Sequence, residues 1–148
     1  MKPSIRVLTL GVHDLEKSLA FYRDGLGLAT EGIIGTEFEG GAVVFFELNG
    51  GLTLALYPKV QIAKDANLPV AQPGTGELAV GHFTIGHFTI GHNVNSKAEV
   101  DAVMEQARKA GAKIDPARDR AWGGYTGHFQ DPDGHLWEVV WNPQFTET

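Results

Sequence analysis

Three histidines lie five residues apart in the stretch GHFTIGHFTIGHN, which spans residues 81–93 and repeats the unit GHFTI. Histidine is a common metal ligand, so His82, His87 and His92 are the first candidates for chemistry. Phe, Thr and Ile favour strands, however, and a strand would place neighbouring histidines about 16 Å apart and turn His87 to the opposite face. Zinc ligands lie within about 2.3 Å of the ion, so one strand cannot bring these three to one metal. The pattern favours a duplicated strand segment.

A carboxylate and an imidazole are brought together by the turn DPDG, which YTGHFQ and HLWEVVW flank. A type I turn with Gly134 in a left-handed bulge places His128 opposite Glu138, with Thr126 on the same face. A two-residue loop would instead place Gly127 opposite Glu138. An adjacent imidazole and carboxylate can exchange protons with a bound molecule as general acid and base.

Composition restricts the class of protein. The chain has 148 residues, of which 43% are hydrophobic and 20% charged, as in one globular domain. It has no cysteine, which excludes disulfides, thiolate metal sites and a cysteine nucleophile. A net charge of −6 argues against a nucleic-acid surface. We find no signal peptide and no segment of membrane-spanning length, and we expect a cytoplasmic protein without a membrane partner.

The elements that must position these residues begin with a strand over residues 6–12. Asp14 is a helix N-cap, apolar residues then recur at helical spacing, and Gly25 supplies the stop. The run VVFFELNGGLTLALYP follows, and its Asn49-Gly50 pair is typical of a hairpin turn.

The same order recurs in the second half of the chain. FTIGHNV predicts a strand over residues 88–94, the capping box SKAE opens a helix at Ser96, Gly111 ends that helix, and DPDG again marks a hairpin. A strand, a helix and a hairpin therefore occur twice, as in an internal repeat. Residues 58–80 between the copies are rich in Pro, Ala and Gly. They predict a surface linker, with a functional lid as the less favoured alternative.

Three segments, VLTLGVHDLEKSLAFYRDGLG, SKAEVDAVMEQARKAGA and WGGYTGHFQDPDGHLWEVVWNP, resemble the glyoxalase/bleomycin-resistance/dioxygenase family, the vicinal oxygen chelate superfamily. The resemblance covers nearly the whole chain, and DPDGHLWEVVW is its most specific part. It implies an α+β fold in one domain over residues 1–148. Module 4–57, linker 58–80 and module 81–142 would build it, each module with the order βαβββ. The two curled sheets would enclose a shared cleft, often within a homodimer.

Metal-binding members of the family hold the ion with His, Gln or Glu at four positions. Carried onto this sequence, those positions fall on Val7, on Leu54 or Ala55 depending on the hairpin register, on Thr89 and on Glu138. Only Glu138 is a family ligand. The resemblance therefore predicts that the usual metal site is missing.

Strand alternation indicates which side chains face the implied cleft. Leu8, Leu10 and Val12 suit packing on a helix, which turns Val7 and Thr9 toward the cleft. In the second module His87 and Thr89 take that face, whereas Phe88, Ile90, Val94 and a half-buried His92 face the helix. Trp122, followed by two glycines, is expected in a loop at the pocket, whereas Trp137 and Trp141 are expected to pack. The candidate ligand-binding residues are Trp122, Thr126, Thr89, His87, Val7 and Thr9.

The resemblance implies two functions. The first is a bleomycin-resistance-like protein that binds a small organic molecule without a metal cofactor, with Glu138 and His128 as the catalytic or anchoring pair. The alternative is a lyase, isomerase or dioxygenase that depends on a divalent metal, for which Glu138, His87 and His128 are the candidate ligands. A family member kept only as an oligomeric partner is a third possibility.

Overall fold

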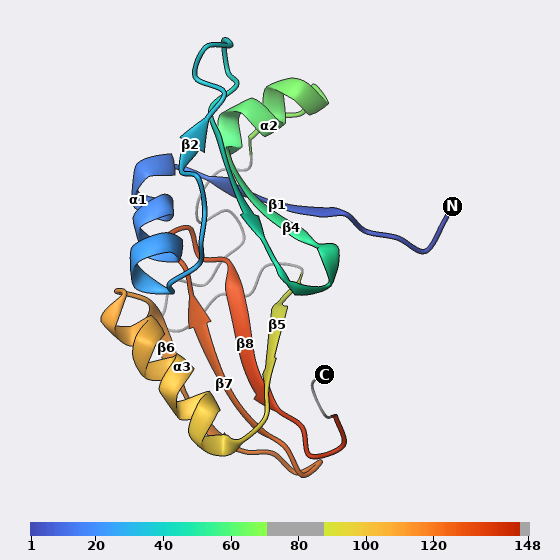
Figure 1. The fold of residues 1–148 in the computed structure, drawn as a ribbon, viewed down its shortest axis with the longest axis vertical. Helices are drawn as coiled ribbons and strands as arrows, with labels where there is room; N and C mark the ends of the chain where they lie inside the picture. Colours follow the sequence, from blue (N-terminus) through green and yellow to red (C-terminus); the bar gives the residue numbers. More distant parts are fainter. Residues whose placement is uncertain (71–87, 146–148) are drawn as a thin grey trace. The chain divides into compact units, whose positions relative to one another are not determined.

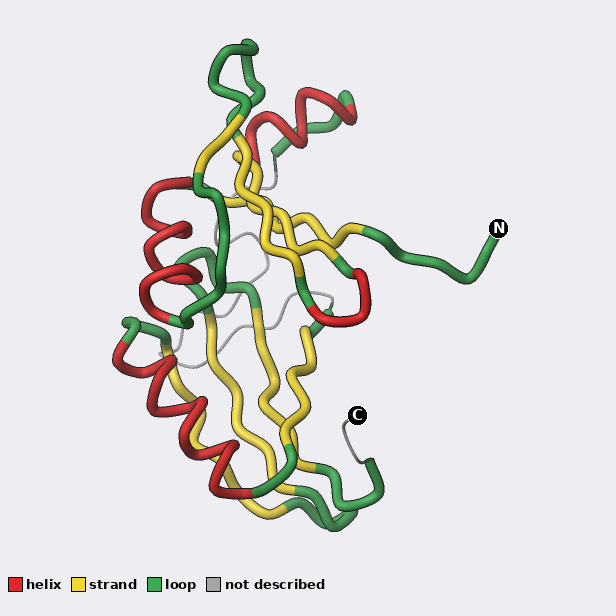
Figure 2. The backbone as a smooth tube through the Cα atoms, in the orientation of Figure 1, coloured by secondary structure: helices red, strands yellow, loops and turns green. Residues whose placement is uncertain are grey.

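The computed structural model describes residues 1–70 and 88–145. The chain divides into two compact units, Met1–His82 and Phe83–Thr148. Each contains one four-stranded mixed sheet with helices packed on it (Figure 1), so the fold class is α+β as predicted. Figure 2 shows that helices and strands account for most of the backbone in both units. The expectation that both modules form a single domain stays a prediction.

The first unit has the strand order β1-β4-β3-β2. Strand β1 runs parallel to β4, and the other neighbours are antiparallel. The elements are β1 (Val7–Val12), α1 (Leu15–Leu19), the π-helix η1 (Ala20–Gly25), β2 (Ile33–Ile34), β3 (Val43–Glu47), the 3₁₀ turn η2 (Asn49–Gly51), β4 (Thr53–Pro58) and α2 (Lys59–Ala66).

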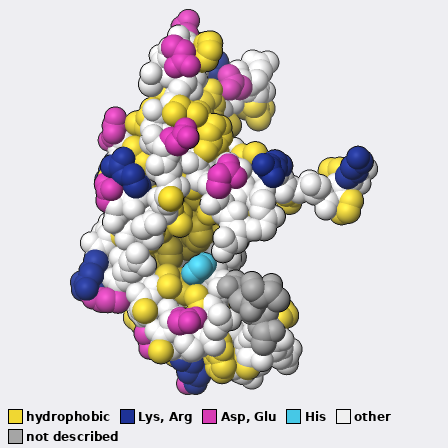
Figure 3. Space-filling model, in the orientation of Figure 1, with side chains coloured by type: hydrophobic (Ala, Val, Ile, Leu, Met, Phe, Trp, Pro, Cys, Tyr) yellow, Lys and Arg dark blue, Asp and Glu magenta, His cyan; other side chains and the backbone are white. Residues whose placement is uncertain are grey.

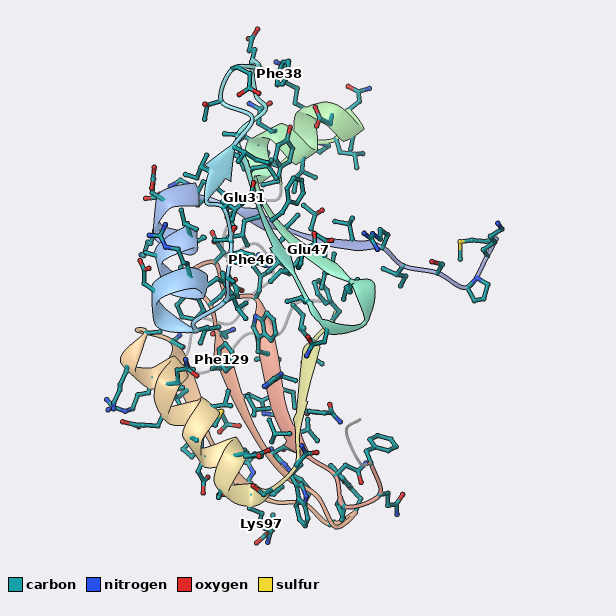
Figure 4. The ribbon with its side chains drawn as sticks, viewed as in Figure 1. Glu31, Phe38, Phe46, Glu47, Lys97 and Phe129 are labelled. Carbon is teal, nitrogen blue, oxygen red and sulfur yellow. The ribbon has the colours of Figure 1, made fainter. Side chains whose placement is uncertain are left out.

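The core of the first unit lies between its sheet and the helical segment that α1 and η1 form. Leu10 and Val12 alternate with exposed or half-buried neighbours along β1 and are each 1% exposed. The Tyr22 ring of η1 lies 5.9 Å from the Phe46 ring of β3, and both are completely buried. Figure 4 labels Phe46 beside these helices. The predicted division of β1 into a helix face and an open face is therefore confirmed.

The second unit has the strand order β5-β8-β7-β6, again with the first strand parallel to its neighbour. Its elements are β5 (Ile90–Val94), α3 (Lys97–Lys109), β6 (Lys113–Asp119), β7 (Tyr125–Gln130) and β8 (Leu136–Trp141). Helix α3 contacts β6, β7 and β8 and buries Val100, Met104 and Ala107. These three residues recur at helical spacing and form one apolar face.

Local signals positioned both principal helices correctly. Asp14 caps α1 by accepting from the Lys17 amide. Ser96 caps α3 by accepting from the Glu99 amide at 3.1 Å. Glu99 reaches back to the Asn95 amide at 2.6 Å, one residue beyond the capping-box partner.

Removing the Ser96 cap is expected to destabilise the protein moderately. Ser96→Ala leaves the Glu99 amide without its acceptor and should lower the free energy of unfolding by about 1 kcal/mol. Ser96→Asp retains an acceptor and should remain close to the parent chain. Urea denaturation followed by circular dichroism measures both variants. Equal losses in the two would show that this oxygen does not stabilise α3.

Part of residues 58–80, which were expected to form a surface linker, has regular structure. Strand β4 runs to Pro58, and α2 then spans Lys59–Ala66 and ends at Asn67 in the left-handed conformation. Helix α2 packs on β1 and β4. The local composition of residues 58–80 does not reveal such contacts with distant segments. Residues 71–80 lie outside the described part of the chain.

Three finer expectations also need correction. The first helix continues beyond Leu19 as the π-helix η1 instead of running unbroken to Gly25. The loop between β3 and β4 has three residues, since Leu48 pairs with Leu52, and both Gly50 and Gly51 have positive φ. Strands β2 and β6 were not recognised as strands in the sequence.

The duplicated histidine stretch is only partly described. His82 and His87 lie outside the described residues, and β5 begins at Ile90. Phe88, expected to face the helix, is 52% exposed. His92, expected to be half-buried, is exposed. Both misses have one physical cause: β5 is an edge strand that α3 does not cover.

Candidate functional site

On the open face of the second sheet one row of paired positions crosses all four strands, and three of these positions carry side chains. Gly91 of β5 pairs with Glu138 of β8, Glu138 with His128 of β7, and His128 with Asp115 of β6. The adjacent Gly127 points the other way, toward α3. The row therefore lies on the face that α3 leaves uncovered.

The row places an imidazole between two carboxylates. His128 Nε2 lies 3.0 Å from Glu138 Oε2, and His128 Nδ1 lies 3.7 Å from Asp115 Oδ2. The three side chains are 22%, 34% and 27% exposed in the order His128, Glu138, Asp115, so solvent and small molecules can reach them. The predicted adjacency of His128 and Glu138 is confirmed, and so is the bulged turn, since Gln130 pairs with Leu136.

Such a row can bind a cation or a hydrogen-bond donor through its carboxylates. The imidazole between them can accept a proton from a bound group or return one. His128 can donate a ring proton to Glu138 through Nε2, and the Asp115 carboxylate, 3.7 Å from Nδ1, adds negative charge on the other side of the ring. Binding and proton transfer can both be performed by the three side chains of the row.

Two arginines border the row, Arg118 in β6 and Arg120 just after that strand ends. Arg118 forms an ion pair with Asp115 at 3.5 Å, across the β-bulge where β6 shifts its register against β7. Arg120 donates to the hydroxyl and the carbonyl oxygen of Thr126. Thr126 lies on the row's face but is 2% exposed, with its hydroxyl engaged by Arg120. A ligand would reach Arg120 before it reached Thr126.

Sequence reasoning missed Asp115 and Arg118 because it treated their strand as a loop, and it missed Arg120, which follows that strand, for the same reason. Pro116 inside KIDPARD hides the strand, since proline is uncommon within sheets. Strand β6 is an edge strand with a bulge, where a proline is tolerated. The segment lacks the clear alternation of apolar and polar residues that is typical of a strand. One face would carry Ile114, Pro116 and Arg118, and the other Asp115 and Ala117.

Trp122 lies in the loop between β6 and β7 and is 54% exposed. A Cβ on Gly124 would come within 1.9 Å of Trp122 Cη2, so the indole rests directly on the glycine backbone. One ring face is therefore covered and the other can meet a ligand. The loop placement agrees with the sequence, and a role in binding stays a prediction.

The sheet register decides which residue of β4 corresponds to Glu138. Thr9 and Gly91 hold equivalent places in β1 and β5, and they pair with Ala55 and Glu138 respectively. Ala55 therefore takes the equivalent position, whereas Leu54 faces the core and is fully buried. Of the alternatives that the sequence left open, the structure selects Ala55.

The remaining candidates belong to other strands or segments than the row. Val7 is 45% exposed and Thr9 is exposed, both on the face of the first sheet away from α1. Thr89 is exposed just before β5 begins, and His87 is outside the described residues. A shared ligand site of these residues with Glu138 stays a prediction.

The donors at the family's metal positions do not fit a metal. Val7 and Ala55 carry only hydrocarbon, and Thr89 carries a hydroxyl, which leaves Glu138 alone. Within the row, Asp115 and Glu138 stand two strand spacings apart, about 9.5 Å, with His128 between them. Among residues 1–70 and 88–145, no three His, Asp or Glu side chains are grouped to hold an ion.

Charge on the surface is mixed. Figure 3 shows acidic and basic side chains scattered over the face in view, without a basic patch there. No helix in the described part of the chain is long and apolar enough to cross a membrane.

Comparison with known proteins covers almost the whole chain. The model of the Glyoxalase/Bleomycin resistance protein/Dioxygenase superfamily matches residues 4–139. A glyoxalase-related enzyme from Fulvimarina pelagi is 31% identical, with a TM-score of 0.78 over 99% of this chain and 93% of that one. None of the curated proteins compared with the sequence matches it.

Two further solved structures share the fold. A glyoxalase/bleomycin resistance protein/dioxygenase from Nocardioides is 26% identical, with a TM-score of 0.70 over 99% of this chain and 88% of that one. Lactoylglutathione lyase from Agrobacterium tumefaciens is 24% identical, with a TM-score of 0.66 over the full length of both chains. With the repeated βαβββ sheets and the match over residues 4–139, the chain belongs to the Glyoxalase/Bleomycin resistance protein/Dioxygenase superfamily.

Proposed function

We propose that this protein binds a small organic molecule on the open face of its second sheet, without the family's usual metal. The observation that carries the proposal is the row in which His128 stands between Glu138 and Asp115. A partly exposed row of two carboxylates and an imidazole can recognise an amine, an alcohol or a phenol by hydrogen bonding. Glu138 is the polar anchor, and His128 transfers protons if the bound molecule reacts.

Family membership supports a small-molecule ligand. The 31% identical relative from Fulvimarina pelagi is described as a glyoxalase-related enzyme. Trp122 offers an indole face for a flat ligand, and Arg120 covers Thr126 at the border of the same sheet face. We also propose a homodimer that acts in the cytoplasm, because both are usual in this family.

A metal-dependent lyase, isomerase or dioxygenase is the alternative. One observation favours it: the family's Glu138 is present, and His128 Nε2, a second possible donor, lies 3.0 Å from its carboxylate. Two donors do not complete a metal site, so further ligands would have to come from outside the row.

Thermal shift with tag-free protein separates the two functions. A panel of small aliphatic and aromatic amines, alcohols and phenols is tested with EDTA and then with Mn²⁺, Ni²⁺ or Zn²⁺. Compounds that bind the native state raise the melting temperature. We expect some of these compounds to bind in the presence of EDTA. Glu138→Gln should weaken their binding about tenfold, since one charge-assisted hydrogen bond is lost.

The matched control is Glu105→Gln, which removes an exposed carboxylate from α3 and changes the net charge equally. It should leave the affinities unchanged. Compounds that bind only with a metal, and lose binding in Glu138→Gln, would establish the alternative function. Equal affinity in the parent chain and Glu138→Gln would place the ligand elsewhere and reject the proposed site.

A further inference from the structure

A second hollow lies in the first unit, on the face of its sheet away from α1. Helix α2 packs there because Gly11 has no side chain: a Cβ on Gly11 would lie 3.3 Å from Ile62 Cδ1 and 3.5 Å from Lys59 Cβ. Figure 1 shows α2 directly following β4. Beside this contact an open hollow of about 460 Å³ remains, lined by Thr9, Tyr57, Ile62, Asp65 and Ala66. Because the hollow is wide open to solvent, it can contact one side of a small ligand.

The lining combines apolar surface with oxygen acceptors. Ile62, Ala66 and the Tyr57 ring supply the apolar surface, and the only charged side chain in the lining is Asp65. Asp65 has no Lys, Arg or His within ion-pair distance among the described residues. The hollow is therefore complementary to a cation with an apolar body.

The hydroxyl of Tyr57 has two acceptors for one proton. It lies 2.7 Å from the Gly40 carbonyl oxygen and 3.2 Å from Asp65 Oδ2. It can donate fully to only one of them, and the Gly40 bond is the shorter. Burial raises the pKa of Tyr57, and the Asp65 carboxylate raises it further, so the phenol keeps its proton at neutral pH. An added N–H donor would complete the hydrogen bonding of Asp65 and of the phenol oxygen.

The surroundings hold these acceptors in place. The loop between β2 and β3 is tied to Tyr57 through Gly40, and Gln61 of α2 lies against the same glycine. A Cβ on Gly40, whose φ is +65°, would come within 2.5 Å of Gln61 Oε1. The loop, the strand and the helix thus meet at the rim, which fixes the geometry before any ligand arrives.

We propose that this hollow binds a small organic cation, a primary amine attached to an aromatic or aliphatic body. The ammonium group donates to Asp65 and to the Tyr57 oxygen, and the apolar body contacts Ile62 and Ala66. This site shares no residue with the row of Glu138, His128 and Asp115. It stands whether or not the row binds a ligand.

Benzylamine is a suitable probe, and benzyl alcohol is its neutral counterpart. With ¹⁵N-labelled protein, benzylamine should shift the amide resonances of Thr9, Ile62 and Ala66 with a Kd on the order of 1 mM. Asp65→Asn should weaken it about fivefold, as expected for an exposed ion pair. Tyr57→Phe keeps the ring and loses the hydroxyl, so it should weaken binding about threefold. Benzyl alcohol has no charge to pair with Asp65. Its Kd for the parent chain should therefore equal or exceed the Kd of benzylamine for Asp65→Asn.

The control for net charge is Glu16→Gln, which removes an exposed carboxylate from α1. Its affinity for benzylamine should equal that of the parent chain at the same ionic strength. The proposal is overturned if Asp65→Asn binds benzylamine as well as Glu16→Gln does, or if benzylamine leaves the resonances of Thr9, Ile62 and Ala66 unshifted. Shifts near His128 that Glu138→Gln removes would assign benzylamine to the row instead.

Discussion

Replacing Phe129 by alanine is expected to lower the free energy of unfolding by about 3–5 kcal/mol, as for other buried Phe→Ala changes. Phe129 is 2% exposed and stacks on Trp137, with ring centroids 5.8 Å apart and an interplanar angle of 5°. Figure 4 labels it beside α3. Truncation leaves a cavity between the helix and β7, and the remaining core can fill it only partly. Urea denaturation followed by tryptophan fluorescence measures the loss.

Phe45 provides the matched control, because it is also a strand phenylalanine but is 41% exposed. Phe45→Ala should cost well under half as much. If Phe129→Ala does not fold, Phe129→Leu keeps most of the buried volume and should give a smaller, measurable loss. Equal costs at Phe45 and Phe129 would contradict the assignment of the core to the α3 side of the sheet.

Valine at position 127 is expected to destabilise the second unit by about 1–3 kcal/mol through overpacking. Gly127 is buried, and a Cβ there would lie 2.9 Å from Met104 Sδ and 3.1 Å from the backbone nitrogen of Ala117. The methionine can move, but the backbone of β6 cannot move without disturbing its pairing. Because Gly127 has no side chain, Met104 of α3 and the backbone of β6 can both lie close to β7.

Gly91→Val tests the same substitution where space is open. Gly91 lies in the edge strand β5, is exposed, and a Cβ there would meet only Asn93 Oδ1, at 3.8 Å. Valine favours strands, so Gly91→Val should be neutral or slightly stabilising. Chemical denaturation of both variants gives the comparison. A similar loss at both positions would mean that the cost arises from valine itself and not from contact with Met104.

This chain has the fold of the family, but most of the family's metal positions carry side chains that cannot bind a metal. The βαβββ repeat is complete, with the match extending over residues 4–139. Yet Val7 and Ala55 present hydrocarbon where metal-binding relatives present donors. The retained Glu138 forms its hydrogen bond with His128 instead. Binding without a metal, as proposed, uses this pair directly.

The sequence by itself determined what depends on a few consecutive residues. Asp14 and Ser96 identified the starts of α1 and α3, because a cap is made within three residues of itself. The DPDG turn indicated two registers of β7 and β8, and the structure has the bulged one, which brings His128 to Glu138. Gly134, with φ of +85°, makes that turn possible.

Only the tertiary structure decided what depends on pairing between distant segments. Ala55 instead of Leu54 shares the sheet face of Thr9, away from α1, because β4 pairs in parallel with β1, far earlier in the chain. Asp115 lies beside His128 because the bulged β6 adds to β7 as an edge strand, and α2 packs on β1 and β4. Turn and cap geometry is set by local backbone angles, whereas strand order and register are chosen by which side chains become buried. Local sequence patterns contain the first kind of information and not the second.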